Sequence, residues 1–260
     1  MLHSLQRYRQ TEHLSPDAFE SANIDYPEYL RRMAETYEIA PKEMYVEEKA
    51  GFAGYDTWAQ TYDLETKNPV ILGEKEALDD LPQNYPEKTV LDVGAGTGRH
   101  AISYANAGAR VTALEPSHQM LNTAISKAAT EGLDIEFHRI DICSWTKDDR
   151  VFDLVLCCLV LSHVEDLATA MRDLVRRVGS NGHLIISDFH PYNLLVGMRT
   201  SFFHGETKFY LPNFIHLPSE YIQLASGKGM KLVEFHETGH IDGFPQMPAT
   251  ISVVFRRDGS

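Results

Sequence analysis

The chain has 260 residues, of which 43% are hydrophobic, and its 24 basic and 37 acidic residues leave a formal net charge of −13. This length and composition suit one globular core with added segments. The negative charge disfavours nucleic acid and anionic membranes as partners, because both are bound by basic protein faces.

The sequence gives no sign of export or of a membrane span. Met1 to Arg7 has no apolar stretch of the kind found in secretory signals, and the longest apolar run, 154–161, is too short to cross a bilayer. Three cysteines, two of them adjacent, do not make a disulfide framework. We therefore expect a cytoplasmic protein.

Residues 1–63 are predicted to form a helical N-terminal extension or cap, followed by the main domain at 64–260. Ser15 and Pro16 suit a helix cap and a first helical position, and apolar residues then follow helical spacing up to Pro41. The segment 54–63 is aromatic and is also predicted to be helical.

The most informative segment begins at Val90. A short apolar strand runs into Asp92, glycines follow at positions 94, 96 and 98, and a helix is predicted over 98–107. Glycine has no Cβ, so such a loop lets a ligand approach the backbone, and the helix behind it presents free N–H groups. An ordinary tight strand-to-helix turn is the alternative interpretation of these glycines.

The glycine spacing separates two kinds of cofactor loop. A dinucleotide-binding G-x-G-x-x-G pattern needs its third glycine where this chain has Arg99. A phosphate-binding P-loop, which ends in Gly-Lys-Ser or Gly-Lys-Thr, is absent from the sequence. The loop therefore fits a ligand other than a pyrophosphate.

Strands and helices alternate beyond the loop, which predicts a parallel doubly wound sheet. Glu115 ends the second strand about 20 residues beyond the glycines, a position suited to ribose hydroxyls. Asp141 ends the third strand in the same way. The predicted strands are 110–115, 134–142, 152–160 and 183–188. The predicted helices are 98–107, which ends at Gly108, 117–131, which ends at Gly132, and 166–178, which ends at Gly179.

An insertion rich in aromatic residues and histidines, 190–217, follows the fifth strand. A helix is predicted to begin at Pro218 and to stop at Gly227 or Gly229, and 231–237 and 249–256 are predicted as the last two strands. Ligands of doubly wound sheets bind beyond the carboxyl ends of the strands. We therefore expect the aromatic segment and the insertion to form a lid over the substrate.

The glycine loop and the strand-end acids, in this order, resemble the class I S-adenosylmethionine-dependent methyltransferases, in particular those that act on small molecules. The resemblance covers roughly Tyr55 to the C-terminus. It implies an α/β fold with a doubly wound, mostly parallel, Rossmann-like sheet of seven strands, of which the final strand is antiparallel. It also implies S-adenosyl-L-methionine as cofactor and S-adenosyl-L-homocysteine as product.

The resemblance also implies roles for individual residues. The glycine loop would contact the methionine moiety, Glu115 the ribose, and Asp141 with Ile142 the adenine. The cofactor-binding residues implied in this way are Tyr62, Asp92, Gly94, Ala95, Gly96, Gly98, Glu115, Pro116, Met120, Asp141, Ile142, Cys158 and Leu159.

His163 and His190 are the candidate catalytic residues, because a histidine can remove a proton from an acceptor at neutral pH. The aromatic residues of 54–63 have two interpretations. Their ring faces could interact favourably with the positively charged sulfonium of S-adenosylmethionine, or they could simply pack a helix onto the sheet. Lone histidines, likewise, often only satisfy hydrogen bonds. The candidate substrate-binding residues are Tyr55, Trp58, Phe189, Tyr192, His204, Tyr210 and His216.

One motif in the chain resembles a zinc-binding site. Residues 236–240 match the zinc-binding pattern H-E-x-x-H, which requires a helix. Here 231–236 alternates like a strand, in which successive side chains face opposite sides, and Gly239 interrupts the motif. Cys157 and Cys158 fit a buried strand better than a metal pair. We therefore predict that no metal is bound.

The predicted reaction is transfer of a methyl group to O, N or C of a small metabolite, in line and with water excluded by the lid. Residues 156–160 lack the Asn/Asp-Pro-Pro-aromatic string of family members that methylate nucleobase or amide nitrogens. We expect a monomer or homodimer. The alternatives are a non-catalytic S-adenosylmethionine-binding or scaffolding protein and, disfavoured by the glycine spacing, a nicotinamide-dependent oxidoreductase.

Overall fold

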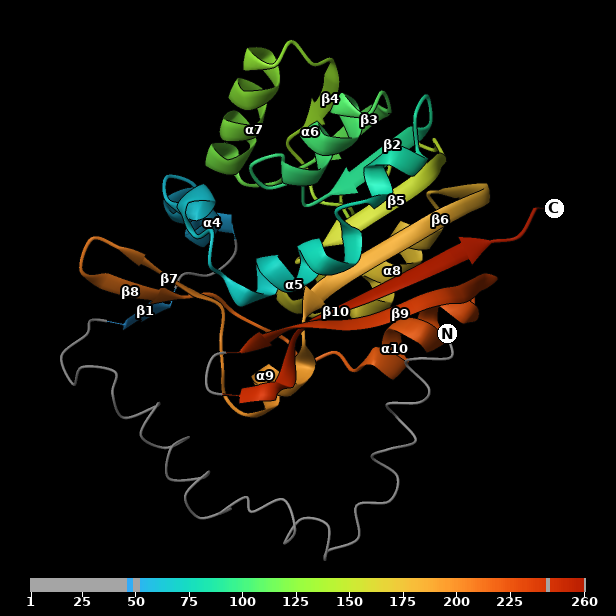
Figure 1. Ribbon diagram of the computed structural model, residues 1–260. Coiled ribbons are helices and arrows are strands. Elements are labelled where there is room, and N and C mark those ends of the chain that lie inside the picture. Colours follow the sequence, from blue (N-terminus) through green and yellow to red (C-terminus); the bar gives the residue numbers. More distant parts are fainter. Residues whose placement is uncertain (1–45, 49–51, 242–243, 260) are drawn as a thin grey trace, which may run out of the picture. The chain divides into compact units, whose positions relative to one another are not determined.

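The computed structural model describes residues 46–48, 52–241 and 244–259 (Figure 1). The chain divides into two compact units, Met1–Tyr45 and Val46–Ser260, and the description below concerns the second. The helix predicted to end before Pro41 lies outside the described residues. The domain boundary between residues 63 and 64 stays a prediction.

Seven strands form the main sheet in the order β4-β3-β2-β5-β6-β10-β9. The first five of these pair in parallel, and β10 is antiparallel to both of its neighbours. The doubly wound, mostly parallel α/β sheet and its antiparallel last strand are therefore confirmed. The strands are β2 (Thr89–Val93), β3 (Arg110–Leu114), β4 (Ile135–His138), β5 (Phe152–Cys158), β6 (Val178–Phe189), β9 (Met230–Ile241) and β10 (Phe244–Arg257).

Helices cover both faces of this sheet (Figure 1). Alternate residues of β5 belong to two apolar clusters: Val155 and Cys157 pack with α8 and α10, whereas Leu154 and Leu156 pack with α6. Burial on both faces explains why the strands read as nearly continuous apolar runs. The helices are α5 (Pro69–Leu78), α6 (Arg99–Asn106), α7 (His118–Thr130), α8 (Leu167–Val175) and α10 (Pro218–Ser226), with short 3-10 turns at η2 (Leu81–Asn84) and η3 (Leu161–His163).

Two of the predicted helix ends are confirmed and one is wrong. Gly108 and Gly132 have left-handed φ values of 92° and 68° just beyond α6 and α7. Helix α8, however, ends at Val175, and Gly179 lies inside β6. The N–H of Phe152 already donates to the carbonyl of Arg177, so pairing with β5 begins where the helix was expected to continue.

The predicted lid segments have regular structure of their own. The insertion contains α9 (Pro191–Leu195) and the strands β7 (Ser201–His204) and β8 (Thr207–Tyr210), and β8 also pairs with β1 (Val46–Glu48). The aromatic segment forms α4 (Phe52–Trp58) and η1 (Tyr62–Leu64). We call residues 52–64 the cap and residues 201–210 the hairpin. No helix in the described ranges is long and apolar enough for a membrane crossing.

Candidate active site

The three glycines after β2 all adopt left-handed backbone conformations, but they serve different purposes. A Cβ on Gly94 would collide with Val160, and one on Gly98 would lie 3.0 Å from the Cβ of Ala124 in α7. Around Gly96 there is no heavy atom within 4 Å of that position. Gly94 and Gly98 are thus required for packing, and Gly96 alone faces open space where a ligand can approach the backbone.

The acid that ends β3 lies against the same glycine. Glu115 accepts hydrogen bonds from the N–H of Gly96 at 2.8 Å and from the N–H of Ser117 at 2.7 Å. Burial raises the pKa of Glu115 to about 7, and the two hydrogen bonds only partly oppose this. The glycine loop and the strand-end acid therefore converge on one spot at the carboxyl edge of the sheet.

Asp92 has a different task from Glu115. It is buried, and one of its carboxylate oxygens accepts the N–H of Ala101 at 2.9 Å, in the first turn of α6. Burial raises the pKa of its carboxyl group. The structure thus shows Asp92 fixing the helix that follows the glycine loop.

Asp141 and Ile142 lie in a turn beyond β4, which ends at His138, so the predicted strand 134–142 is too long. The Asp141 carboxylate accepts the N–H and the hydroxyl of Ser144, at 3.0 and 2.6 Å. Ile142 is buried in an apolar cluster with α8. A contact of these two residues with adenine stays a prediction.

The end of β5 adjoins the glycine loop. Cys158 is the last residue of the strand, and Leu159 has a φ of 59°, which is unusual for a residue with a branched side chain. The N–H of Leu159 donates to the carbonyl of Ser187, and the next residue, Val160, packs against Gly94. This strained turn leads directly into η3, which carries His163.

His163 is held in an orientation and in a neutral form that suit a general base. Its Nδ1 lies 2.7 Å from the carbonyl oxygen of Pro212 and must donate to it, which leaves a lone pair on Nε2. Burial lowers the pKa of the imidazole, so the ring is neutral near pH 7. The ring of Tyr55 from the cap meets it edge-on, with centroids 5.5 Å apart.

The other candidate histidines are used differently. The buried ring of His190 accepts the N–H of Tyr192 at Nδ1 and donates to Glu237 from Nε2, at 3.3 and 3.0 Å. His216 donates to the carbonyl of Val164 at 2.7 Å. His204 is exposed on β7. We therefore keep only His163 as the candidate base, because the two ring nitrogens of His190 are occupied.

The aromatic candidates divide into two groups. Trp58 is only 4% exposed, stacks on Phe202 of the hairpin with centroids 5.0 Å apart, and joins a cluster that includes Met120. Trp58 thus joins the cap to the hairpin by packing, and Met120 of α7 belongs to the same apolar cluster. The remaining candidates lie nearer the surface: Tyr62 beside Trp58, Phe189 at the end of β6, Tyr192 on the ring of His190 and Tyr210 beside Lys208.

Asp188, the residue before the last one of β6, was not singled out from the sequence. It is buried and accepts the N–H groups of Ser162 and Phe189 at 2.6 and 2.8 Å, and burial raises its pKa to about 6. Asp188 therefore fixes η3, which carries His163. Its position at a strand end, like that of Glu115, was the signal in the sequence.

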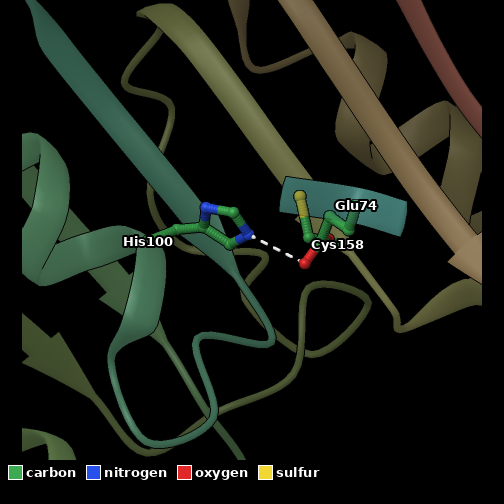
Figure 2. A group of neighbouring side chains, drawn as sticks. All are labelled: Glu74, His100 and Cys158. Carbon is green, nitrogen blue, oxygen red and sulfur yellow. Dashed lines mark ion pairs between the residues drawn. The ribbon is translucent and has the colours of Figure 1, made fainter. Parts of the chain in front are cut away.

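A buried cluster behind the glycine loop was also missed (Figure 2). Glu74 on α5 is completely buried, forms an ion pair with Arg99, accepts the hydroxyl of Ser187, and lies 3.4 Å from His100 Nε2. Burial alone would raise the pKa of Glu74, but the charges of His100 and Arg99 outweigh burial and hold the pKa at about 2. The cluster is therefore ionic.

Glu74, His100 and Cys158 offer potential metal ligands within 4.8 Å of one another, and no other such group occurs among the described residues. Two observations oppose a cation there. The guanidinium of Arg99 and the Ser187 hydroxyl already occupy the two carboxylate oxygens of Glu74, and burial raises the pKa of the Cys158 thiol. We interpret the cluster as a buried ionic link between α5, α6 and the sheet.

The H-E-x-x-H segment lies in strand β9, as the sequence pattern predicted. His236 contacts Glu234 of its own strand, and Glu237 contacts His190, both at 3.0 Å. The helical geometry that a zinc protease site needs is therefore missing from this segment.

Comparison with known proteins finds similarity to methyltransferases. Residues 91–186, from β2 to β6, match a protein family described as a methyltransferase domain. The chain resembles a magnesium protoporphyrin IX methyltransferase from Synechocystis PCC 6803, solved with bound S-adenosylhomocysteine (TM-score 0.60, 20% identity, 79% of this chain and 94% of that one). Residues 91–186 thus resemble a methyltransferase domain in sequence, and the chain has the fold of class I methyltransferases.

Among relatives in sequence, the ubiquinone biosynthesis O-methyltransferase of Coxiella burnetii is 32% identical over 154 residues, 56% of this chain. The match spans 65% of that relative, less than two thirds of its length. The fold also resembles that of the cyclase SpnF (TM-score 0.61, 17% identity, 80% of this chain and 96% of that one). The methyltransferase fold thus carries more than one named activity.

Proposed function

We propose that this methyltransferase moves a methyl group from S-adenosylmethionine to a small-molecule acceptor. The observation that supports it most is the pairing of Gly96 with Glu115: an open backbone approach and a strand-end carboxylate meet at 2.8 Å. When bound, the cofactor supplies an electrophilic methyl group on a sulfonium. The carboxylate of Glu115 would accept the ribose hydroxyls, and Gly96 would let the amino-acid end approach the loop.

His163 is the proposed general base. Its Nε2 lone pair can take a proton from an acceptor hydroxyl while Nδ1 stays bonded to Pro212, so the ring keeps its orientation during the proton transfer. Asp188 holds the turn that carries this histidine. The O-methyltransferase activity named for the Coxiella burnetii relative favours an oxygen acceptor.

The cap and the hairpin would exclude water from the reaction. Stacking of Trp58 on Phe202 joins the two elements, and Tyr55 extends from the cap to His163. Exclusion of water strengthens the electrostatic contacts inside a site and holds the reacting groups in line. The net charge of −13 agrees with a free metabolite as acceptor, because nucleic acid would need a basic face.

The decisive experiment incubates the protein with S-adenosylmethionine labelled in its methyl group and a metabolite extract, and then identifies the labelled product. A parallel thermal shift assay compares S-adenosylhomocysteine with NAD, because a bound ligand raises the melting temperature by mass action. Binding of S-adenosylhomocysteine with no labelled product would favour a non-catalytic protein. A shift with NAD alone would overturn the proposal.

A further inference from the structure

Asp63 of the cap binds the residue between Gly96 and Gly98. Its carboxylate accepts the hydroxyl of Thr97 at 2.7 Å and pairs with the ammonium group of Lys127 on α7 at 2.8 Å. Lys127 also donates to the carbonyl of Thr97 at 3.0 Å. These three groups form a closed ring that fixes both the side chain and the backbone of Thr97.

The cap makes a second contact on the other side of Glu115. Asp56 accepts the hydroxyl of Ser117 at 2.7 Å and the N–H of Gln119 at 2.9 Å, where α7 begins. The cap is thus attached next to both groups of the candidate site: to Thr97, which follows Gly96, and to Ser117, whose N–H donates to Glu115. Helix α4 accordingly lies between α7 and the hairpin strands β7 and β8 (Figure 1).

The ion pair of Asp63 with Lys127 is not expected to stabilise the fold much. The two side chains are 42% and 36% exposed, and ion pairs of this kind contribute little to the stability of a fold. Thr97, which both of them hold, is buried. The contact instead fixes the position of one loop residue relative to the cap.

We propose that Asp63 and Lys127 are positioning residues for the cofactor loop and that their contact sets how long the cofactor product stays bound. This inference rests on the proposed function, since it assumes a ligand at Gly96 and Glu115. Release of that ligand requires the cap to leave Thr97. Breaking the ring around Thr97 should therefore speed dissociation while the fold stays intact.

The test measures the dissociation rate of S-adenosylhomocysteine by stopped-flow fluorescence. Trp58 in the cap is one of only two tryptophans. Asp63→Asn and Lys127→Met should release the ligand about three- to tenfold faster, the effect of losing a partly exposed, charged hydrogen bond. Lys127→Arg should keep the slow rate. Lys231→Met on β9, which breaks the exposed ion pair with Asp258, is the matched control and should leave the rate unchanged.

Salt distinguishes positioning from general loosening of the fold. Added salt should speed release from the wild-type protein, because it screens the ion pair, but should have little effect on Lys127→Met. Equal rates and equal salt dependence in wild type and variants would overturn the inference alone. Failure of the wild-type protein to bind S-adenosylhomocysteine would instead overturn the proposed function. If Asp63→Asn folds poorly, Lys127→Met decides, because its side chain lies partly in solvent.

Discussion

Gly96 differs from its two neighbouring glycines because the space beside it is open. Replacing it with alanine puts a methyl group into the path of the ligand, so the affinity for S-adenosylhomocysteine should fall at least about tenfold, measured by calorimetry. Gly108→Ala is the control: it too has a left-handed φ and no heavy atom within 4 Å, but it lies outside the site. Both variants should lose about 1 kcal/mol of stability from backbone strain. An unchanged affinity in Gly96→Ala would remove Gly96 from the site.

Glu115 should make the binding of S-adenosylhomocysteine dependent on pH. Its pKa of about 7 means that the carboxyl group is increasingly protonated below pH 7, and a protonated carboxyl is a poorer acceptor for ribose hydroxyls. The affinity for S-adenosylhomocysteine should therefore fall as the pH drops below 7, by up to about tenfold per pH unit. Glu115→Gln should bind weakly with no such pH dependence. A flat wild-type profile would place the ribose elsewhere.

His163 should affect the chemical step and leave cofactor binding unchanged. His163→Gln should lower kcat by about 10²- to 10⁴-fold, the usual contribution of a general base, with the dissociation constant of S-adenosylhomocysteine unchanged. His240→Gln, on the exposed surface of β9, is the control and should retain its rate. Single-turnover assays with the identified acceptor measure both rates. Equal rates for wild type and His163→Gln would exclude this histidine as the base.

At the scale of elements, Glu74 joins α5 to α6 and to the sheet. Glu74→Ala would leave the buried guanidinium of Arg99 without its partner, and such a loss typically costs about 3–5 kcal/mol in the free energy of unfolding. Glu76→Ala, on the exposed side of the same helix, is the control. Urea unfolding measures both variants. A loss below about 1 kcal/mol in Glu74→Ala would mean that the ionic link contributes little.

The same carboxylate predicts how stability changes with pH. The pKa of Glu74 is about 2 in the folded protein, below its ordinary value of 4.5. A lowered pKa stabilises the fold above the unfolded value, and this stabilisation is lost as the pH falls from about 4.5 to about 2. The acid-induced loss of unfolding free energy should therefore be smaller in Glu74→Gln than in wild type. Parallel curves for the two proteins would contradict this.

We propose that access of the acceptor depends on the hairpin. Replacing residues 199–212 by a short turn would remove Phe202 from Trp58 and the Pro212 carbonyl from His163. Methyl transfer should therefore be lost while S-adenosylhomocysteine still binds, and the intact hairpin should be cut more slowly by proteases when acceptor and product are both present. Normal transfer by the shortened protein would show that the insertion is only surface structure.

At the scale of the whole molecule, strand order explains where the site lies. β2 has β3 on one side and β5 on the other, so the chain reverses its direction of winding at this strand. A crevice opens at such a point beyond the carboxyl ends of the strands. Four features lie at the carboxyl ends of neighbouring strands: the glycine loop after β2, Glu115 after β3, the turn at Leu159 after β5, and Asp188 near the end of β6. They are therefore brought to one edge although they are far apart in sequence.

Local patterns determined much of this protein without any structure. The alternation of apolar runs with helical segments was enough to predict the parallel sheet, and the glycines at 94, 96 and 98 with the acid at 115 marked the candidate site at its edge. These features depend on short stretches of chain, in which burial and backbone conformation select the residue types directly. The alternation of polar and apolar residues in 231–236 likewise predicted a strand, and not the helix that a zinc motif requires, and the strand is β9.

Only the tertiary structure decided the use of individual polar side chains. The sequence alone could not separate His163 from His190 as the base. In the folded chain both ring nitrogens of His190 have partners, whereas only Nδ1 of His163 bonds, to the carbonyl of Pro212, because folding brings these partners from distant segments. The ring of Asp63, Thr97 and Lys127 likewise joins residues from three separate elements. Contacts of this kind depend on how helices and loops pack around the sheet, and no local pattern encodes them.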